Sequence, residues 1–274
     1  MAPAQVPKPA LAGRSIIVTR AKAQAQGLTT LLEALGGFVI HCPTIEFIPP
    51  SDSGPLDNAI DRIESFDWIV FTSANAVSFF CRRLLERHPE GVSSLLSLVA
   101  CAIGPATAKA LAAVEVEVDL VAEDSTSEGV VAAIIEFAGG GEALSGVRVL
   151  VPQARLAREV IPVELSRLGA LVETVEAYQT VRPDVDSEKV VSALRARSVD
   201  AILFTSPSTV SNFASIVGVG DLSVLLSDCL VACIGPVTAA AARELGLRNV
   251  VAPATHTSAA LVELVSDSLA SRRS

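Results

Sequence analysis

Hydroxyl and glycine residues recur where apolar segments end and helices are expected to begin. Ser73 and Ser206 each follow a Phe-Thr pair, while Gly104 and Gly235 each open a Gly-Pro-x-Thr sequence. Serine is a favoured N-cap residue, and proline fits the first helical position. A helix N-terminus can bind an anion through its free N–H groups and its dipole. These residues therefore predict either plain helix caps or contacts to the carboxylate or phosphate groups of a ligand.

Further polar side chains fall in the same places. Thr107 and Thr238, the threonines of the two Gly-Pro-x-Thr sequences, put a hydroxyl in the first helical turn. Arg20 follows the first apolar segment, and Arg155 and Arg158 follow its counterpart. An arginine at the carboxyl end of a strand can hold a carboxylate bidentately, although a solvated surface arginine is the alternative. The recurrence of the pattern in both halves of the chain favours a ligand.

The recurrence reflects an internal sequence repeat with two copies. Residues 67–77 return as residues 200–210 at an offset of 133, and residues 102–108 return as 233–239 at an offset of 131. In each copy, short apolar segments alternate with segments of helical spacing, which is typical of βαβ units with a parallel sheet. We therefore predict an α/β protein with two similar lobes, each a parallel sheet flanked by helices. Ligands of such sheets bind at the carboxyl ends of the strands, so we expect the site where the two copies face each other.

Some segments depart from this alternation. Residues 39–50 and 172–183 are long and carry charges, which suits a two-stranded β-ladder that joins the lobes. Within the second of them we expect two extended pieces, broken near Glu176. Residues 156–168 are expected to form a helix, and residues 1–12 a disordered lead-in.

Composition excludes several classes of protein. The 274 residues carry a net charge of −9, which argues against nucleic-acid binding, and contain no apolar run of 18 residues that could span a membrane. The three histidines have no ligand spacing, so we expect no metal. The five cysteines form no C-x-x-C sequence and are expected to be reduced, which indicates a cytoplasmic protein.

Tyr178 is the only tyrosine and lies in one of the two connecting segments. Composition alone suggests that this tyrosine is an interfacial packing residue. The sequence has no phosphate-binding G-x-x-x-x-G-K-[ST], no G-x-G-x-x-G after a strand and no serine, histidine and aspartate in the order of a known triad. An enzyme with this sequence would work without a recognisable cofactor motif.

Taken together, the motifs resemble the uroporphyrinogen-III synthase family. The resemblance covers residues 13 to about 265 and is carried by an ordered set of stretches. They are residues 17–20, 35–37, 43–47, 66–77, 103–110, 177–180, 202–213, 234–245 and 252–261.

The resemblance implies a two-lobed fold in which the first strand and helix complete the C-terminal lobe. Residues 13–38 with 184–270 would then form lobe one. Residues 51–171 would form lobe two, and residues 39–50 and 172–183 the connecting ladder.

The resemblance also implies the reaction of a hydro-lyase. Hydroxymethylbilane, a linear tetrapyrrole with eight carboxylates, would lose water and close to uroporphyrinogen III, with ring D inverted through a spiro intermediate. Tyr178 matches the cleft tyrosine of the family and is the candidate proton donor. Thr107, Ser206 and Thr238 match positions that line the cleft, Ser73 is the repeat partner of Ser206, and Arg20 and Arg158 fall where the family can place basic groups. Many relatives have an arginine where this chain has Gln153, so that basic contact is missing unless Arg155 or Arg158 supplies it.

No cofactor or metal is expected. Hydroxymethylbilane synthase would be the upstream partner, and a monomer is expected because the two copies already supply an internal pair. The alternative is a non-catalytic two-lobed module that binds an anionic small molecule. A flavin or nucleotide protein of flavodoxin type is a third alternative, which the missing phosphate-loop glycines disfavour.

Overall fold

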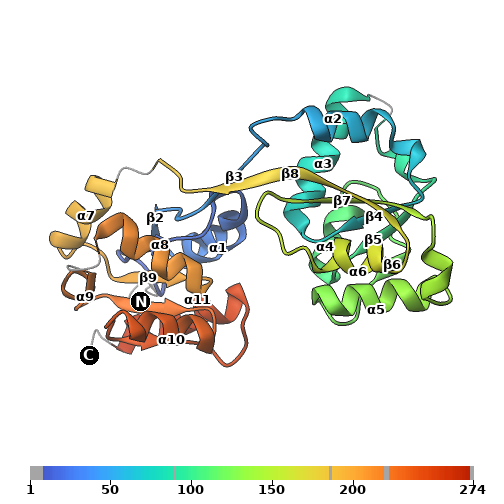
Figure 1. The fold of residues 1–274 in the computed structure, drawn as a ribbon. Helices are drawn as coiled ribbons and strands as arrows, with labels where there is room; N and C mark the ends of the chain where they lie inside the picture. The colour runs from blue at the N-terminus through green and yellow to red at the C-terminus, as the bar shows by residue number, and fades with distance from the viewer. Residues whose placement is uncertain (1–8, 89–90, 185–186, 219–221, 272–274) are drawn as a thin grey trace, which may run out of the picture. The chain divides into compact units, whose positions relative to one another are not determined.

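The computed structural model describes residues 9–88, 91–184, 187–218 and 222–271. The chain divides into two compact units, which are Met1–Glu46 with Val181–Ser274 (unit 1) and Phe47–Thr180 (unit 2). Each unit contains parallel strands with helices packed on both faces (Figure 1). The predicted α/β class with helix-flanked parallel sheets is therefore confirmed.

Unit 1 is built on a five-stranded sheet with the strand order β11-β10-β9-β1-β2, in which all neighbours are parallel. β1 comes from the start of the chain but lies between β2 and β9, so the first copy supplies two strands to this sheet. The strands are β1 (Ser15–Val18), β2 (Phe38–His41), β9 (Ala201–Phe204), β10 (Leu230–Cys233) and β11 (Val250–Val251). The helices are α1 (Lys22–Ala34), α7 (Ser187–Arg195), α8 (Pro207–Val217), α9 (Leu222–Leu225), α10 (Pro236–Glu244) and α11 (Ser258–Ser271).

Unit 2 is built on a six-stranded sheet with the order β3-β8-β7-β4-β5-β6, whose neighbours from β8 to β6 are parallel. The strands are β3 (Glu46–Ile48), β4 (Trp68–Phe71), β5 (Val99–Ala102), β6 (Leu120–Val121), β7 (Arg148–Ala154) and β8 (Leu171–Val181). The helices are α2 (Gly54–Asp61), α3 (Ala74–Arg87), α4 (Pro105–Ala112), α5 (Ser127–Phe137) and α6 (Val160–Arg167), with 3₁₀ turns at Ile63–Ser65, Gly91–Leu95 and Gly141–Leu144.

The central strands are apolar on both sides because helices cover both faces of each sheet. In β4, Ile69 and Phe71 pack with α2, α3 and α4, whereas Trp68 and Val70 pack with α5 and α6. Unit 1 repeats this alternation, with one core facing α7, α8 and α10 and the other facing α1 and α11. The continuous apolar strands of the sequence follow from this double burial.

β8 is one continuous strand with an irregularity near the expected break. Gln153 of β7 pairs with Glu176, but the next residue, Ala154, pairs with Tyr178, so Ala177 is an extra residue in β8. In a regular strand Tyr178 would share a face with Glu176 and lie opposite Ala177. Here Ala177 and Tyr178 both belong to the core beneath α3. The β-bulge therefore turns the tyrosine to the α3 face.

Three expectations differ from the structure. The helix expected over residues 156–168 is only Val160–Arg167, because Pro162 lacks an N–H group and is tolerated only in a first turn. Of the lead-in over residues 1–12, residues 1–8 lie outside the described residues, but Leu11 is fully buried against α1 and α11. The ladder expected from residues 39–50 and 172–183 is found only as the pairing of β3 with β8, since β2 pairs with β1 and most of β8 with β7.

Two glycines in helices give a matched test of this packing. A Cβ atom on Gly129 in α5 would lie 2.3 Å from the carbonyl oxygen of Asp124, whereas a Cβ atom on Gly27 in α1 would have no atom within 4 Å. Gly129→Ala should therefore lower the free energy of unfolding by about 1–3 kcal/mol. Gly27→Ala should raise it by about 0.4–1 kcal/mol. Equal effects of the two substitutions in urea denaturation would contradict the packing of α5.

A second test concerns the ion pairs between α2 and α3. Arg83 donates to both carboxylate oxygens of Asp57 at 2.7 Å, and Arg87 lies 3.2 Å away, so the pKa of Asp57 is lowered. A lowered pKa stabilises the fold above the ordinary carboxyl pKa, and the contribution is lost as the pH falls through the lowered value. Asp57→Asn should thus destabilise the protein at pH 7 and have less effect in acid. A destabilisation that is constant from pH 7 to about pH 2 would contradict the ion pair.

Candidate active site

The carboxyl ends of the parallel strands in unit 2 bring several predicted residues to one edge. Ser73 follows β4, Gly104 follows β5, and Arg158 lies in the loop after β7. Because β4 lies between β7 and β5, Ser73 has the other two segments on either side. Tyr178 reaches the same region from β8.

Ser73 and Tyr178 are predicted site residues from distant parts of the chain that the structure joins directly. The Ser73 Oγ atom lies 3.2 Å from the Tyr178 hydroxyl oxygen, and either can be the donor. Ser73 is also the N-cap of α3, with an extended backbone, and its Oγ atom accepts a hydrogen bond of 3.0 Å from the Ala76 N–H group. The predicted cap is thus present and also holds the tyrosine.

Aromatic rings fix the orientation of the tyrosine. Phe79 of α3 stacks on the Tyr178 ring at a centroid distance of 5.6 Å, and Phe47 meets it edge-on at 5.7 Å. Arg82 covers the Phe79 ring at 4.6 Å. Tyr178 is only 7% exposed, so a substrate can reach little more than one side of it. Sequence reasoning missed Phe47 and Phe79, although Phe79 stands less than two helical turns after Ser73.

The Gly104 turn is tightly packed. Gly104 is the N-cap of α4, and a Cβ atom there would lie 2.2 Å from the Ser125 Oγ atom. Thr107 is 3% exposed and contributes its N–H group to the first turn, where it donates to the Gly104 carbonyl. The predicted threonine is therefore largely enclosed in the turn.

Arg158 lies in an exposed loop rather than in the expected helix. The loop begins at Arg155, whose N–H group donates to the Tyr178 carbonyl at 3.1 Å, and it contains Leu156, which is 93% exposed. Gln153 is half-buried at the end of β7. The loop therefore carries two exposed arginines, and one of them, Arg155, is hydrogen-bonded through its backbone to Tyr178.

In unit 1 the remaining predicted residues share the carboxyl edge of the five-stranded sheet. Ser206 caps α8 in a capping box with Thr209, and Gly235 is the N-cap of α10. Arg20 follows β1, and its Nε atom donates to Gln24 at 3.4 Å. Thr238 is 3% exposed, as is its counterpart in unit 2.

His256 is a residue of this edge that sequence reasoning missed. Its ring lies against Gly235, where a Cβ atom would come 3.0 Å from the His256 Cδ2 atom. Ser125 holds the same place against Gly104, and the two positions differ by the 131 residues that separate the Gly-Pro-x-Thr sequences. The offset alone could have identified this histidine.

The cysteines are poorly suited to chemistry at neutral pH. All five are buried, and burial raises the pKa of Cys42 to about 11 and those of Cys81, Cys101 and Cys233 to about 12. These thiols therefore stay protonated and are weak nucleophiles. Among residues 9–88, 91–184, 187–218 and 222–271, no three His, Cys, Asp or Glu side chains come together as a metal site.

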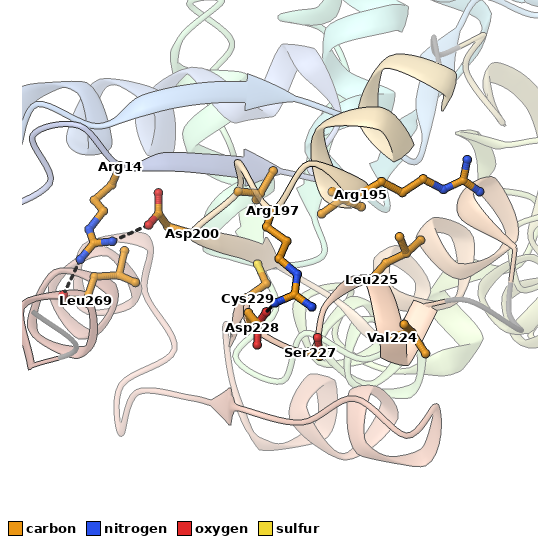
Figure 2. Close-up of a pocket in the computed structure, with 12 residues that line it drawn as sticks. Arg14, Arg195, Arg197, Asp200, Val224, Leu225, Ser227, Asp228, Cys229 and Leu269 are labelled. Atoms are coloured by element: carbon orange, nitrogen blue, oxygen red, sulfur yellow. Dashed lines mark hydrogen bonds and ion pairs between the residues drawn. The ribbon is translucent and has the colours of Figure 1, made fainter.

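A separate cavity of about 340 Å³ lies in unit 1 at the amino ends of β1, β9 and β10. Figure 2 shows Arg14 directed at Asp200 and the Leu269 carbonyl, and Arg197 directed at Asp228, while Arg195 extends away from both pairs. Its ionic groups are thus largely paired with each other. It also lies at the edge of the sheet opposite to the predicted residues.

Comparison with known proteins identifies the family. A family model described as uroporphyrinogen-III synthase HemD matches residues 26–263. The chain belongs to the uroporphyrinogen-III synthase family. It is 36% identical over 243 residues to the uroporphyrinogen-III synthase of Synechococcus elongatus. The aligned residues cover 86% of this chain and 88% of the relative.

Solved structures of the family share the fold. The uroporphyrinogen-III synthetase of Helicobacter pylori matches with a TM-score of 0.57 at 20% identity, covering 93% of this chain and 99% of that one. A mutant uroporphyrinogen III synthase of Thermus thermophilus also gives 0.57, at 16% identity, covering 95% of this chain and all of that one. Within the described residues, no helix is both long and apolar enough to cross a membrane.

Proposed function

We propose that the chain converts hydroxymethylbilane into uroporphyrinogen III by loss of water, with inversion of ring D through a spiro intermediate. Its family places it among the lyases of porphyrin and haem biosynthesis. The observation that carries the residue-level proposal is the Tyr178 hydroxyl, which the β8 bulge and the α3 cap hold at the carboxyl edge of unit 2.

Tyr178 is proposed to protonate the leaving hydroxyl of the substrate. As the C–O bond breaks, the electron pair goes to the leaving oxygen, water departs and an azafulvene cation remains on the bilane. Attack by the substituted carbon of ring D then gives the spiro intermediate, which opens and recloses at the unsubstituted carbon of ring D. The proton lost from that carbon balances the one that the tyrosine gave up. A phenol is a mild acid, but the pyrrole nitrogen pushes the hydroxyl out, so mild acid assistance is enough.

The two carboxyl edges are proposed to bind the carboxylates of the substrate. In a chain with a net charge of −9, such groups need local donors, and helix N-termini and arginines supply them. Orientation is the second task, because the substituted carbon must reach the cation before the unassisted closure occurs. The proposed contacts are Ser73, Gly104, Thr107 and Arg158 in unit 2 and Arg20, Ser206, Gly235 and Thr238 in unit 1.

We further propose a monomeric cytoplasmic enzyme whose substrate comes from hydroxymethylbilane synthase. A non-catalytic module for an anionic small molecule is less favoured, because the relatives and the similar solved structures carry the names of enzymes.

Chromatography of the product isomers tests the proposed reaction. The purified protein, supplied with hydroxymethylbilane and followed by oxidation of the products, should yield the type III isomer well above the background. Only type I product, formed at the rate seen without protein, would contradict the proposal. The non-catalytic binding module would then be the favoured function.

The role of Tyr178 has its own test. Tyr178→Phe keeps the ring between Phe47 and Phe79 but removes the acidic hydroxyl. It should slow type III formation by roughly 10²–10⁴-fold, the typical contribution of a general acid, and leave substrate binding nearly unchanged. Unchanged type III turnover in this variant would remove Tyr178 from the chemistry.

A further inference from the structure

We infer that Ser73 acts on the reaction through Tyr178, as a positioning residue that donates a hydrogen bond to the phenolate formed when the tyrosine gives up its proton. The inference rests on the proposed role of Tyr178, and for Ser73 it replaces the carboxylate contact proposed above. A direct contact between Ser73 and a substrate carboxylate is the alternative.

The hydrogen bonds of Ser73 leave one arrangement for this step. A serine hydroxyl has one hydrogen to donate and two lone pairs that accept. The Ala76 N–H group occupies one lone pair at 3.0 Å, and the Tyr178 oxygen lies 3.2 Å away. Once the tyrosine O–H bond breaks, its electron pair stays on the phenolate oxygen, which can only accept. The Ser73 hydrogen must then point to Tyr178.

The start of α3 strengthens this hydrogen bond. The helix runs for 14 residues, and Ser73 is its N-cap, so the positive end of its dipole lies beside the serine. The Ala76 N–H group polarises the serine hydroxyl, as hydrogen bonds in a chain do. Since Tyr178 is only 7% exposed, water can provide little of this stabilisation itself.

The second copy of the repeat shows that the contact does not follow from the cap. Ser206 caps α8 as Ser73 caps α3, but its Oγ atom lies 2.9 Å from the Ser208 hydroxyl. The position 133 residues before Tyr178 is Ile45, which belongs to unit 1 together with Ser206, so unit 1 has the cap without the tyrosine. The cap was duplicated, and the link to a phenol exists in unit 2 alone.

The single tyrosine makes the inference directly measurable without substrate. Its ionisation changes the absorbance near 295 nm, and no other phenol contributes. In Ser73→Ala the midpoint of this titration should lie higher than in the wild type, because the phenolate loses a hydrogen-bond donor. Type III turnover at saturating substrate should fall by about tenfold. Ser73→Thr, which keeps the hydroxyl, should resemble the wild type in both measurements.

Loss of the cap itself needs a separate control. Thr126→Ala removes a side-chain cap of the same kind from α5, where Thr126 accepts from the Gly129 N–H group at 3.0 Å. It should lower the midpoint temperature of thermal unfolding, as Ser73→Ala should, without moving the midpoint of the tyrosine titration. Ser73→Asp covers the case in which Ser73→Ala does not fold, because aspartate caps helices well but has no hydrogen to donate. Its titration should also move to higher pH.

The outcomes separate the inference from the proposed function. A folded Ser73→Ala or Ser73→Asp variant with an unmoved titration would overturn the inference, and lost turnover with an unmoved titration would show a direct substrate contact instead. An equal shift in Thr126→Ala would overturn it as well. If wild type forms only type I product, the proposed function fails and the catalytic part of the inference falls with it, whatever the titration shows.

Discussion

The β-bulge at Ala177 decides which face of the six-stranded sheet carries the tyrosine. Without the bulge, the two-residue period of the same sequence would place Tyr178 with Glu176, away from α3. With it, the ring enters the core between Phe47 and Phe79, and its hydroxyl meets the first turn of α3. The proposed proton donor depends on this bulge more than on any feature of the tyrosine itself.

The internal repeat accounts for the scaffold, and the proposed chemistry depends on departures from the repeat. Both copies place a serine cap and a Gly-Pro turn at the carboxyl edge of a parallel sheet, which gives each unit free N–H groups that can hold carboxylates. The departures lie at single positions. Tyr178 stands where the first copy has Ile45, and His256 stands where it has Ser125. The proposed enzyme thus has two similar binding edges and one proton donor.

Local patterns in the sequence were enough to predict the α/β class and the caps at Ser73 and Ser206. Buried parallel strands read as continuous apolar runs, and a cap depends on only a few neighbouring residues. The bulge was not predictable in detail, because a register shift depends on the partner strand β7. The sequence indicated only a break in the extended segment near Glu176. The pairing of β1 with β9 is equally non-local, and only the family resemblance indicated it. The proximity of Phe47 and Phe79 to Tyr178 needed the folded chain, since it joins residues of β3, α3 and β8.

The most direct measurement of the central claim is a double-mutant cycle on the rate of type III formation, with Ser73→Ala, Tyr178→Phe and both together. If Ser73 acts through the phenol, Ser73→Ala will slow the wild type but will not slow Tyr178→Phe any further, because the hydroxyl it serves is already gone. If the two losses instead multiply, the residues act independently, and the account of a tyrosine held and supported by the α3 cap is contradicted.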